Sequence, residues 1–479
     1  MKQQNVSRKI GKKPISHEKV YQLFGPQASF EEIRQAAARI CRDYLNGRWK
    51  EVPTEQLIVK RISGGLSNFL YYVSLPQYCN ATTATISNEV NESVASTSSS
   101  SALPQSDNDE NRNEQDFSDL LSAGDCNGNK RKRYDSSSST LASAYRQKEP
   151  KEVLLRIYGQ SHGEDALEQM ITESVVFALL SERHFGPRLY GIFPGGRLEQ
   201  YIPARALLTS ELAIPEISMK IAEKMAEIHT LNIPMSKEPD WLWNCMERWQ
   251  RYLPDILKPN SKWPNKEAVS VMRDIDYDQE VLWLKGVISM HNFPVMFCHN
   301  DMQEGNILMK IPTNDESESK KPIADLDSSG DSAIDNANSC TSPDLKIIDF
   351  EYCAYNYRGF DIANHFLEWT FNYSRPDFPF YYYNSENYPT KEQRDQFIRT
   401  YLKKFNDKDD DWEPTQKEID DVNQEVTVFR MMSHLFWSLW AVMNVTSNIE
   451  FGYWEYAVCR IKEYLNLKQA YINDHMMTV

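Results

Sequence analysis

The stretch FCHNDMQEGNILM, residues Phe297 to Met309, decides how the rest of the chain is interpreted. It places His299, Asp301 and Asn306 on a short polar segment with apolar residues on both sides. The apolar runs favour burial, and loops held between buried segments commonly carry binding and catalytic side chains. The polar cluster is therefore a candidate active site.

The spacing of these residues, H-x-D-x-x-x-x-N, is that of the catalytic loop of kinases. In such a loop an Asp accepts the hydroxyl proton of the phosphoryl acceptor and holds its oxygen in line. An Asn five residues later reaches a metal ion bound by the nucleotide phosphates. The spacing thus predicts Asp301 as the base and Asn306 as a metal ligand. We expect His299 to pack and hydrogen-bond the loop rather than to carry a proton.

A second carboxylate follows another apolar run, in the stretch LKIIDFEY that contains Asp349. An Asp after such a strand holds Mg²⁺ in kinase-like enzymes, because carboxylate oxygens suit this hard cation. The alternative is that Asp349 only caps the following turn. With the upstream loop in view, we predict Asp349 as a ligand of Mg²⁺ and place Gln303 and Glu351 near the same site.

Composition limits the classes of protein to which the chain can belong. Its 479 residues are enough for two core-bearing lobes, since single cores usually stop growing near ~250 to 300 residues. A net charge of −15 argues against a nucleic-acid-binding protein, so the expected partner is a small molecule. Eight cysteines without a C-x-x-C pair or zinc spacing predict free thiols in a reducing compartment. Without a signal-like segment or a run of ~18 apolar residues, we expect a soluble cytoplasmic protein with no integral membrane segment.

Two stretches of low complexity interrupt the globular pattern. Residues from about 80 to 150 are rich in Ser, Asn, Asp and Thr, and residues from about 312 to 344 are acidic and rich in Ser. Neither has enough apolar content to offset the entropy of ordering, so both are predicted to be disordered insertions. The second separates the apolar runs NILMKI and LKIIDF, which we expect to form adjacent strands.

The remaining pattern predicts an α+β protein with two lobes. Residues 1–20 are expected to be a basic flexible tail. Strand and turn signals with one amphipathic helix occupy 21–202, which we assign to a small β-rich N-lobe. Most periodic segments in 203–479 are helical and are assigned to a larger C-lobe. A β-rich lobe followed by a helical lobe is the outline of the protein-kinase-like fold.

Phosphate binding is expected from the stretch ISGGLSN, which joins two predicted strands of the N-lobe. Gly64 and Gly65 allow a positive φ and expose consecutive backbone N–H groups to phosphate oxygens. An ordinary hairpin turn is the alternative, because the stretch is neither a Walker A loop nor a GxGxxG. The predicted nucleotide-binding residues of this turn are Ser63, Gly64, Gly65, Leu66, Ser67 and Asn68.

Arg156, in VLLRIYG, stands where kinase-like folds carry a strand lysine directed at the nucleotide phosphates. Arginine there departs from the protein-kinase pattern. We expect Glu173, on the following helix, to orient it as an ion pair. The stretch LEQYIP fits the connector between the lobes, where backbone groups of Gln200 and Ile202 meet an adenine edge; a hairpin without a ligand is the alternative.

Aromatic residues near the C-terminus indicate the phosphoryl acceptor. HLFWSLW puts Trp437 and Trp440 on one helical face. EFGYWEYA adds further rings on a following helix, namely Phe451, Tyr453 and Tyr456. Aromatic residues at helical spacing are usually core, but several ring faces also suit a quaternary ammonium. An acidic neighbour such as Glu368, in FLEW, would reinforce the preference for a cation.

In these stretches the chain resembles the choline/ethanolamine kinases. The matching segments run in family order: ISGGLSN, LLRIYG, GPRLYGIFPGGRLEQYIP, CHNDMQEGNIL, IIDFEYCAYNYRGFDIANHFLEW and IEFGYWEYA. The resemblance implies phosphorylation of choline to phosphocholine with ATP and Mg²⁺, on the route to phosphatidylcholine, commonly by a homodimer. It implies Asp301 as base, Asn306 and Asp349 as metal ligands, and Arg156, Gln200 and Gln303 as nucleotide contacts. The implied acceptor pocket comprises Asp301, Glu368, Tyr373, Trp437, Trp440, Phe451 and Tyr456.

Three alternatives stay open at the level of sequence. LEQYIP and EFGYWEY resemble the choline branch more than the ethanolamine branch, but both amines share a cationic head and a two-carbon alcohol. An ethanolamine-preferring or dual-specificity kinase is therefore the nearest alternative. A catalytically inactive scaffold is disfavoured by the intact Asp301, Asn306 and Asp349. An aminoglycoside phosphotransferase-like enzyme is disfavoured by the aromatic pair, because a polycationic sugar needs acidic residues more than rings.

Overall fold

The computed structural model describes residues 17–25, 28–62, 68–76, 149–158, 166–258, 263–310, 343–407, 412–447 and 449–476. The predicted turn 63–67 and nearly all of the two predicted insertions lie outside these ranges. Helix α1 (His17–Phe24) begins inside the segment expected to be a tail.

An antiparallel sheet with the strand order β1-β2-β3-β5-β4 forms the N-terminal part. Its strands are β1 (Ile58–Ile62), β2 (Asn68–Ser74), β3 (Glu152–Tyr158), β4 (Leu189–Phe193) and β5 (Gly196–Gln200). The predicted strand pair around residues 63–67 is confirmed, and β4 and β5 form a hairpin. Across β3 and β5, Arg156 faces Arg197, so both guanidinium groups start from neighbouring positions of the sheet.

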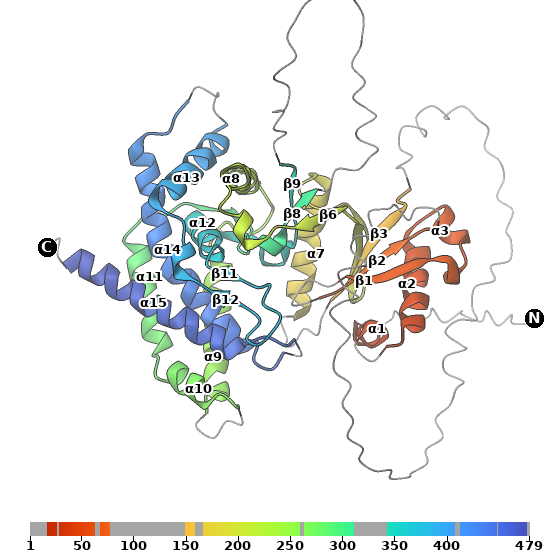
Figure 1. Cartoon of the computed structure of the whole chain (residues 1–479), viewed down its shortest axis with the longest axis horizontal. Coiled ribbons are helices and arrows are strands. Elements are labelled where there is room, and N and C mark those ends of the chain that lie inside the picture. Colours follow the sequence, from red (N-terminus) through yellow and green to blue (C-terminus); the bar gives the residue numbers. More distant parts are fainter. Residues whose placement is uncertain are drawn as a thin grey trace, which may run out of the picture.

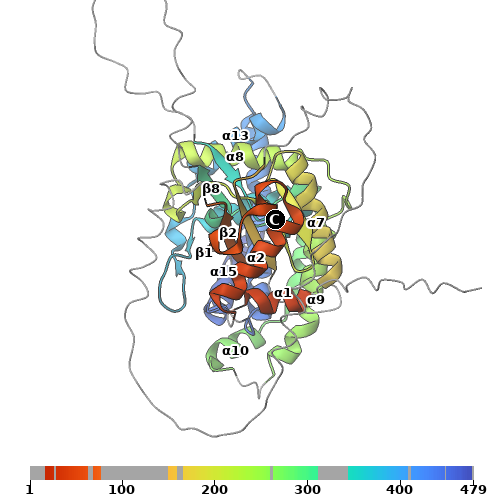
Figure 2. The ribbon, with the colours of Figure 1, turned by 90° about the vertical axis from the view of Figure 1, so that its right-hand side faces the viewer.

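Three helices cover the outer face of this sheet, namely α1, α2 (Phe30–Tyr44) and α3 (Arg48–Glu51), followed by the 3-10 turn η1 (Thr54–Gln56). Helix α2 begins at a capping box, in which Ser29 N–H donates to the Glu32 carboxylate at 2.8 Å. Its small buried residues Ala37 and Ala38 let it approach the sheet closely, in a core shared with Val73 and Leu155. Figure 2, viewed from this end, shows α1 and α2 in front of the sheet.

The C-terminal part is mainly helical. Its helices are α8 (Pro215–His229), α9 (Asp240–Ile256), α10 (Lys266–Arg273), α11 (Tyr277–Ser289), α12 (Arg358–Glu368), α13 (Lys391–Phe405), α14 (Gln416–Met443) and α15 (Tyr453–Met476). Helix α14 is buried on most of its surface, because α9, α12 and α15 all pack against it. These helices confirm the helical character predicted for most periodic segments of this part. Among the described residues, no helix has the length and apolar composition needed to cross a membrane.

Short strands and turns complete the described part of the chain. One three-stranded sheet has the order β6-β8-β9, and two antiparallel pairs join β7 with β10 and β11 with β12. These strands are β6 (Ala204–Ala206), β7 (Val295–Cys298), β8 (Ile307–Lys310), β9 (Leu345–Ile347), β10 (Ala354–Tyr357), β11 (Phe371–Asn372) and β12 (Tyr382–Tyr383). The 3-10 turns are η2 (Thr209–Glu211), η3 (Glu304–Asn306), η4 (Phe350–Tyr352) and η5 (Ser385–Asn387). Strands β8 and β9 pair directly, which confirms that the second low-complexity stretch separates adjacent strands.

Figure 1 shows the five-stranded sheet at one end of the molecule and the helices α9 to α15 at the other. Between them lie β6, β8, β9 and the helix α7 (Ala166–Glu182). Helix α7 contributes Val176, Phe177 and Leu180 to the large core of the helical part. The predicted α+β architecture with a β-rich and a helical lobe is confirmed, and the candidate site lies on the segments between the lobes.

Candidate active site

Asp301 and Asp349 belong to two segments that the strands β8 and β9 bring side by side. Strand β7 leads into the loop at 299–303, whereas β9 leads into Asp349. Two hydrogen bonds join these segments at Ile348: its N–H donates to Asn306 O, and its carbonyl bonds His299 Nε2, both at 3.0 Å. Since Ile348 precedes Asp349, these bonds hold the carboxylate of the second segment beside the polar loop of the first.

Asn306 and Asp301 are in direct contact within that loop. The Asn306 Nδ2 donates to the backbone oxygen and to Oδ2 of Asp301, at 2.9 Å in both cases. With Nδ2 turned toward Asp301, Oδ1 is the atom that Asn306 can offer to a cation. The structure therefore brings together the predicted base and the two predicted metal ligands.

Both segments contain a residue in the left-handed backbone region. Asn300 has φ 67° and Asp349 has φ 64°, a conformation that costs about 1 kcal/mol or more for residues other than glycine. Hydrogen bonds on both ends of the Asn300 amide hold it in place: Nδ2 donates to Tyr352 O at 2.9 Å, and Oδ1 accepts from Asn356 at 2.8 Å. Such strain persists only where the surroundings enforce it, and it is concentrated at functional sites.

His299 uses both ring nitrogens inside the loop. Because the Ile348 carbonyl can only accept, Nε2 donates to it, and Nδ1 accepts from the Asp301 N–H at 3.3 Å. Burial lowers the pKa of the His299 imidazole. This geometry agrees with the structural role that we expected for His299.

Negative charge is concentrated around Asp301. Burial, followed by the carboxylates of Glu368 and Asp349, raises the pKa of Asp301 well above its usual value. Burial and then Asp349 likewise raise the pKa of Glu351, which lies near the same site as we expected. A bound cation would relieve this repulsion. The carboxylate of Asp349 and the amide oxygen of Asn306 are hard oxygen donors, so the residues present fit a divalent cation such as Mg²⁺.

Arg156 connects the N-terminal sheet to this site. Its Nε lies 3.1 Å from Glu199 Oε1 and its Nη1 lies 3.4 Å from Asp349 Oδ1, and the guanidinium is almost fully buried. A cation therefore reaches from β3 to the second carboxylate, at a position suited to phosphate oxygens.

The expected ion pair between Glu173 and Arg156 is wrong. Glu173 bonds Arg197 Nη1 at 2.6 Å, and Arg197 Nε bonds Glu199 at 3.0 Å. The reason is the arrangement of β5 against α7: the Arg197 guanidinium lies 4.0 Å from the centre of the Phe177 ring, next to the helix that carries Glu173. The Glu199 carboxylate therefore accepts from both arginines, from Arg156 on Oε1 and from Arg197 on Oε2.

The other predicted nucleotide-binding residues are only partly described. Ser63, Gly64, Gly65, Leu66 and Ser67 lie outside the described residues, and Asn68 opens β2 opposite Tyr158. The Gln200 side chain accepts from Arg188 N–H at 3.2 Å, which closes the β4–β5 end. The Gln303 side chain accepts from Gly305 N–H at 3.2 Å and caps η3.

The predicted acceptor residues form one aromatic cluster next to Glu368. The Tyr373 hydroxyl donates to Glu368 Oε2 at 2.9 Å and lies 3.2 Å from the Tyr456 hydroxyl. The Tyr456 ring centre lies 5.6 Å from that of Phe451 and 6.5 Å from that of Trp440. After burial, the Glu368 carboxylate has the largest effect on the pKa of Asp301, so the ring cluster and the candidate base share one region.

Two details of this cluster differ from the expectation. Phe451 does not lie on the following helix, because α15 begins at Tyr453 and the Gly452 N–H before it donates to Pro379 O at 3.1 Å. Trp437 is more deeply placed than Trp440: it is buried, and its Nε1 donates to Asn364 Oδ1 at 2.7 Å. Trp440 is half-buried and is the more accessible ring of the pair.

Comparison with known proteins identifies the family. Residues 134–465 match the choline/ethanolamine kinase family. The chain belongs to the choline/ethanolamine kinase family. A human protein named choline/ethanolamine kinase is 35% identical, over 93% of this chain and 88% of its own length. Mouse choline kinase alpha is 34% identical, over 91% of this chain and 81% of its own.

Solved structures support the fold. A choline kinase from Cryptosporidium parvum has a TM-score of 0.59 at 23% identity, over 92% of this chain and 97% of that chain. An ethanolamine kinase from Plasmodium vivax has a TM-score of 0.58 at 16% identity, over 96% of each chain. The protein is thus a kinase with the protein-kinase-like bilobal fold, as predicted.

Two buried charged residues near the site of this choline/ethanolamine kinase family member were not predicted from the sequence. Arg460 is fully buried, and its Nη2 bonds Glu368 Oε1 at 2.7 Å and the Tyr456 hydroxyl at 2.5 Å. The charge of Glu368 is therefore compensated within the protein. The available signal was helical spacing, since Arg460 lies four residues after Tyr456 and shares its face of α15.

Glu304 is the second residue that was not predicted from the sequence. It is 8% exposed, its Oε1 accepts from the Thr209 hydroxyl at 2.8 Å, and its Oε2 has no partner among the described residues. Burial, and then the carboxylate of Glu368, raises the pKa of Glu304 to about 7. Only its place in the loop, between Asp301 and Asn306, pointed to it in the sequence.

Proposed function

We propose that this kinase phosphorylates choline with ATP and Mg²⁺, and that Asp301 is the base. The observation that carries the proposal is the joint placement of Asp301 with Asn306, with the segment of Asp349, and with the ring cluster around Tyr373 and Tyr456. Family membership supports a phosphoryl transfer to choline or ethanolamine.

In this mechanism Asp301 accepts a hydrogen bond from the choline hydroxyl and holds the oxygen in line with the transferred phosphoryl group. The hydrogen bond from Asn306 Nδ2 fixes the rotamer of the Asp301 carboxylate. Cations bound nearby would favour the ionised form of the Asp301 carboxylate, which is the form that can accept a proton.

Arg156 binds the nucleotide phosphates from the N-terminal lobe while remaining anchored to Glu199. Asn306 and Asp349 would hold Mg²⁺, which when bound would neutralise charge that develops on the phosphoryl oxygens. Arg156 Nη1 lies 3.4 Å from Asp349 Oδ1, which puts its guanidinium beside the proposed metal ligand.

The quaternary ammonium of choline fits the rings better than the carboxylates. It has no N–H to donate, and Glu368 is already bonded to Tyr373 and Arg460. Each ring face that it meets, such as those of Trp440, Phe451 and Tyr456, stabilises a desolvated cation by about 0.5 to 2 kcal/mol. Choline in this cluster directs its hydroxyl toward Asp301.

The test is ADP release with choline and with ethanolamine, for the wild type and for Asp301→Asn. The substitution keeps the shape but removes the base, so kcat is expected to fall by about 10²-fold to 10⁴-fold. Asp377→Asn is a matched control, because Asp377 is exposed and its carboxylate pairs with Arg375 at 3.0 Å. Equal turnover of the wild type and Asp301→Asn would refute the assigned base.

Ethanolamine is the second candidate substrate, and the unpartnered Oε2 of Glu304 favours it. A primary ammonium carries N–H donors that such an oxygen can accept, whereas choline does not. A kcat/KM ratio that strongly favours ethanolamine would replace the choline assignment with this one.

A further inference from the structure

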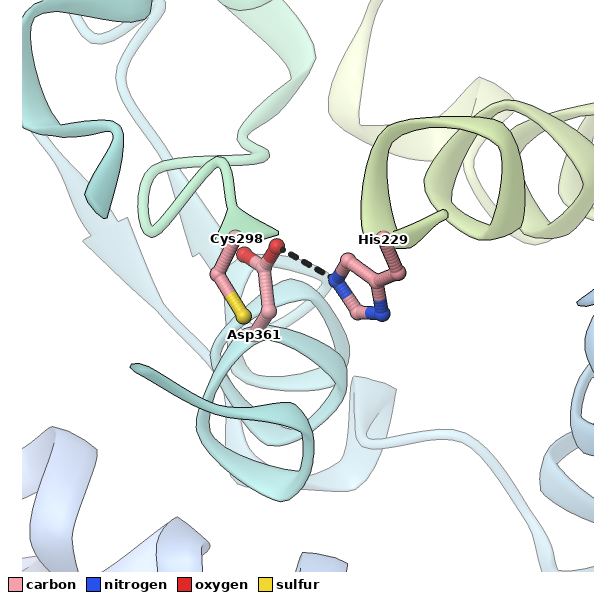
Figure 3. A group of neighbouring side chains, drawn as sticks. All are labelled: His229, Cys298 and Asp361. Atoms are coloured by element: carbon pink, nitrogen blue, oxygen red, sulfur yellow. Dashed lines mark hydrogen bonds and ion pairs between the residues drawn. The ribbon is translucent and has the colours of Figure 1, made fainter. Parts of the chain in front are cut away.

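A buried polar group lies directly beneath the loop that carries Asp301. It consists of His229 on α8, Cys298 at the end of β7 and Asp361 on α12, whose donor atoms all lie within 4.8 Å of one another. Figure 3 shows the three side chains pointing toward one another from separate elements. None of them contributes to the chemistry described above, so their arrangement requires its own explanation.

The Asp361 carboxylate is occupied by protein donors on both oxygens. Its Oδ2 accepts from His299 N–H at 2.8 Å, and its Oδ1 accepts from Asn300 N–H at 2.9 Å. His229 Nε2 lies 3.0 Å from Oδ2 and supplies a third hydrogen bond. Burial alone raises the pKa of Asp361, but these bonds, with the His229 ring first among them, outweigh it and lower the pKa. The group is therefore a hydrogen-bonded network rather than a set of metal ligands.

The network continues to α13 through Tyr401. His229 Nδ1 lies 2.8 Å from the Tyr401 hydroxyl, and both side chains are buried. Because an ionised carboxylate only accepts, His229 Nε2 donates to Asp361, and Nδ1 accepts from the tyrosine hydroxyl. The direction of every bond is then set, from Tyr401 through His229 to Asp361.

Three helices thus fix one carboxylate, and that carboxylate fixes the backbone of the loop. The two N–H groups that Asp361 binds belong to His299 and Asn300, immediately before Asp301. Asn300 is the residue in the left-handed conformation, whose strain must be offset by its surroundings. Rotation of the Asp361 carboxylate would release both N–H groups and let the Asp301 segment move.

We propose that His229 and Tyr401 are positioning residues of this kinase, which orient Asp361 and through it hold Asp301 in its reactive place. The proposal rests on the role of Asp301 given under the proposed function. Neither residue touches substrate; each acts through Asp361. Misplacement of a reacting group by about 1 Å can cost about 100-fold in rate, so the effect belongs in kcat rather than in KM.

The experiment compares His229→Leu, His229→Gln and Tyr401→Phe in the full chain. His229→Leu removes the donor to Asp361, and kcat is expected to fall about 10-fold to 100-fold, with KM for both substrates within about 2-fold. His229→Gln restores an N–H donor near the position of Nε2 and should recover most of that loss. Tyr401→Phe loses one hydroxyl only, so a smaller decrease in kcat, about 2-fold to 10-fold, is expected.

Tyr464→Phe is the matched control. Tyr464 is equally buried and its hydroxyl bonds Glu280 at 2.5 Å, away from the loop. Both Tyr→Phe variants should lose similar stability, but only Tyr401→Phe should lower kcat. Hydrogen exchange of the peptide containing His299 and Asn300 gives a readout independent of activity, and it should accelerate in His229→Leu and Tyr401→Phe but not in the control.

The proposal would be overturned if His229→Leu and Tyr401→Phe both left kcat and the hydrogen exchange at His299 and Asn300 unchanged. This holds even if their melting temperatures fell like that of Tyr464→Phe. A second outcome is also possible: the wild type releases no ADP with choline or ethanolamine, but hydrogen exchange at His299 and Asn300 is faster in the variants. This outcome would reject the proposed function and support the positioning of the loop. The two failures are therefore distinguishable.

Discussion

Replacement of Glu304 by glutamine should stabilise the folded protein relative to the wild type, by an amount that increases as the pH rises. In the wild type, burial and the Glu368 carboxylate raise the pKa of Glu304 from its usual 4.5 to about 7. The difference of about 2.5, at about 1.4 kcal/mol for each pKa unit, corresponds to about 3 kcal/mol. Glu304 is 8% exposed, so solvent screens little of this effect.

The sign follows from proton binding. Below about pH 4.5, Glu304 is protonated in both the folded and the unfolded state and has no pH-dependent effect. Between about pH 4.5 and 7 the folded protein binds more protons than the unfolded chain, so the free energy of unfolding decreases as the pH rises. Above about pH 7 the full cost of burying the carboxylate is present. Glu304→Gln removes this pH dependence and keeps an oxygen that can accept from Thr209.

Urea unfolding of the wild type and of Glu304→Gln, between about pH 5 and 8, measures the difference. The stability of the variant relative to the wild type should rise by about 3 kcal/mol across this range. Glu211→Gln is the control, since the hydrogen bond from Arg205 lowers the pKa of Glu211. Glu211 is ionised in both the folded and the unfolded protein in this range, so the loss of stability in Glu211→Gln relative to the wild type should not change with pH. If the difference in stability between Glu304→Gln and the wild type did not change with pH, the reasoning would be refuted.

Two further perturbations test the buried charges and the ring cluster. Arg197→Met removes the cation that pairs with Glu173 and leaves Glu199 with Arg156 alone, so urea unfolding should show a loss of about 3 to 5 kcal/mol; a loss below 1 kcal/mol would contradict this role. Trp440→Leu removes one ring face, so KM for choline should rise about 2-fold to 30-fold while KM for ATP is unchanged. Equal increases in both KM values would indicate a general distortion.

Local sequence patterns were sufficient for the framework of this protein. The H-x-D-x-x-x-x-N spacing placed Asp301 and Asn306 on one loop, and the apolar runs on either side of the second low-complexity stretch predicted the β8–β9 pair that brings Asp349 beside them. These features depend on residues close in sequence or on strands that must pair to satisfy their backbone groups. Local propensity and hydrophobic burial therefore determine them.

The partners of the buried charges could not be predicted in the same way. Glu173 bonds Arg197 rather than Arg156, because the register of β3 against β5 and the position of α7 decide which guanidinium is nearer. Glu368 is compensated by Arg460, 92 residues later in the chain. Composition and spacing cannot distinguish among several arginines at such separations.

The sequence by itself determined which residues are present in the candidate site and in what order they follow one another. Only the tertiary structure decided how they are charged and held: the raised pKa of Glu304, and the chain of bonds from Tyr401 through His229 to Asp361. The physical reason is that burial and hydrogen-bond geometry depend on distances of a few ångströms between helices far apart in the chain, and these distances exist only once the lobes have packed.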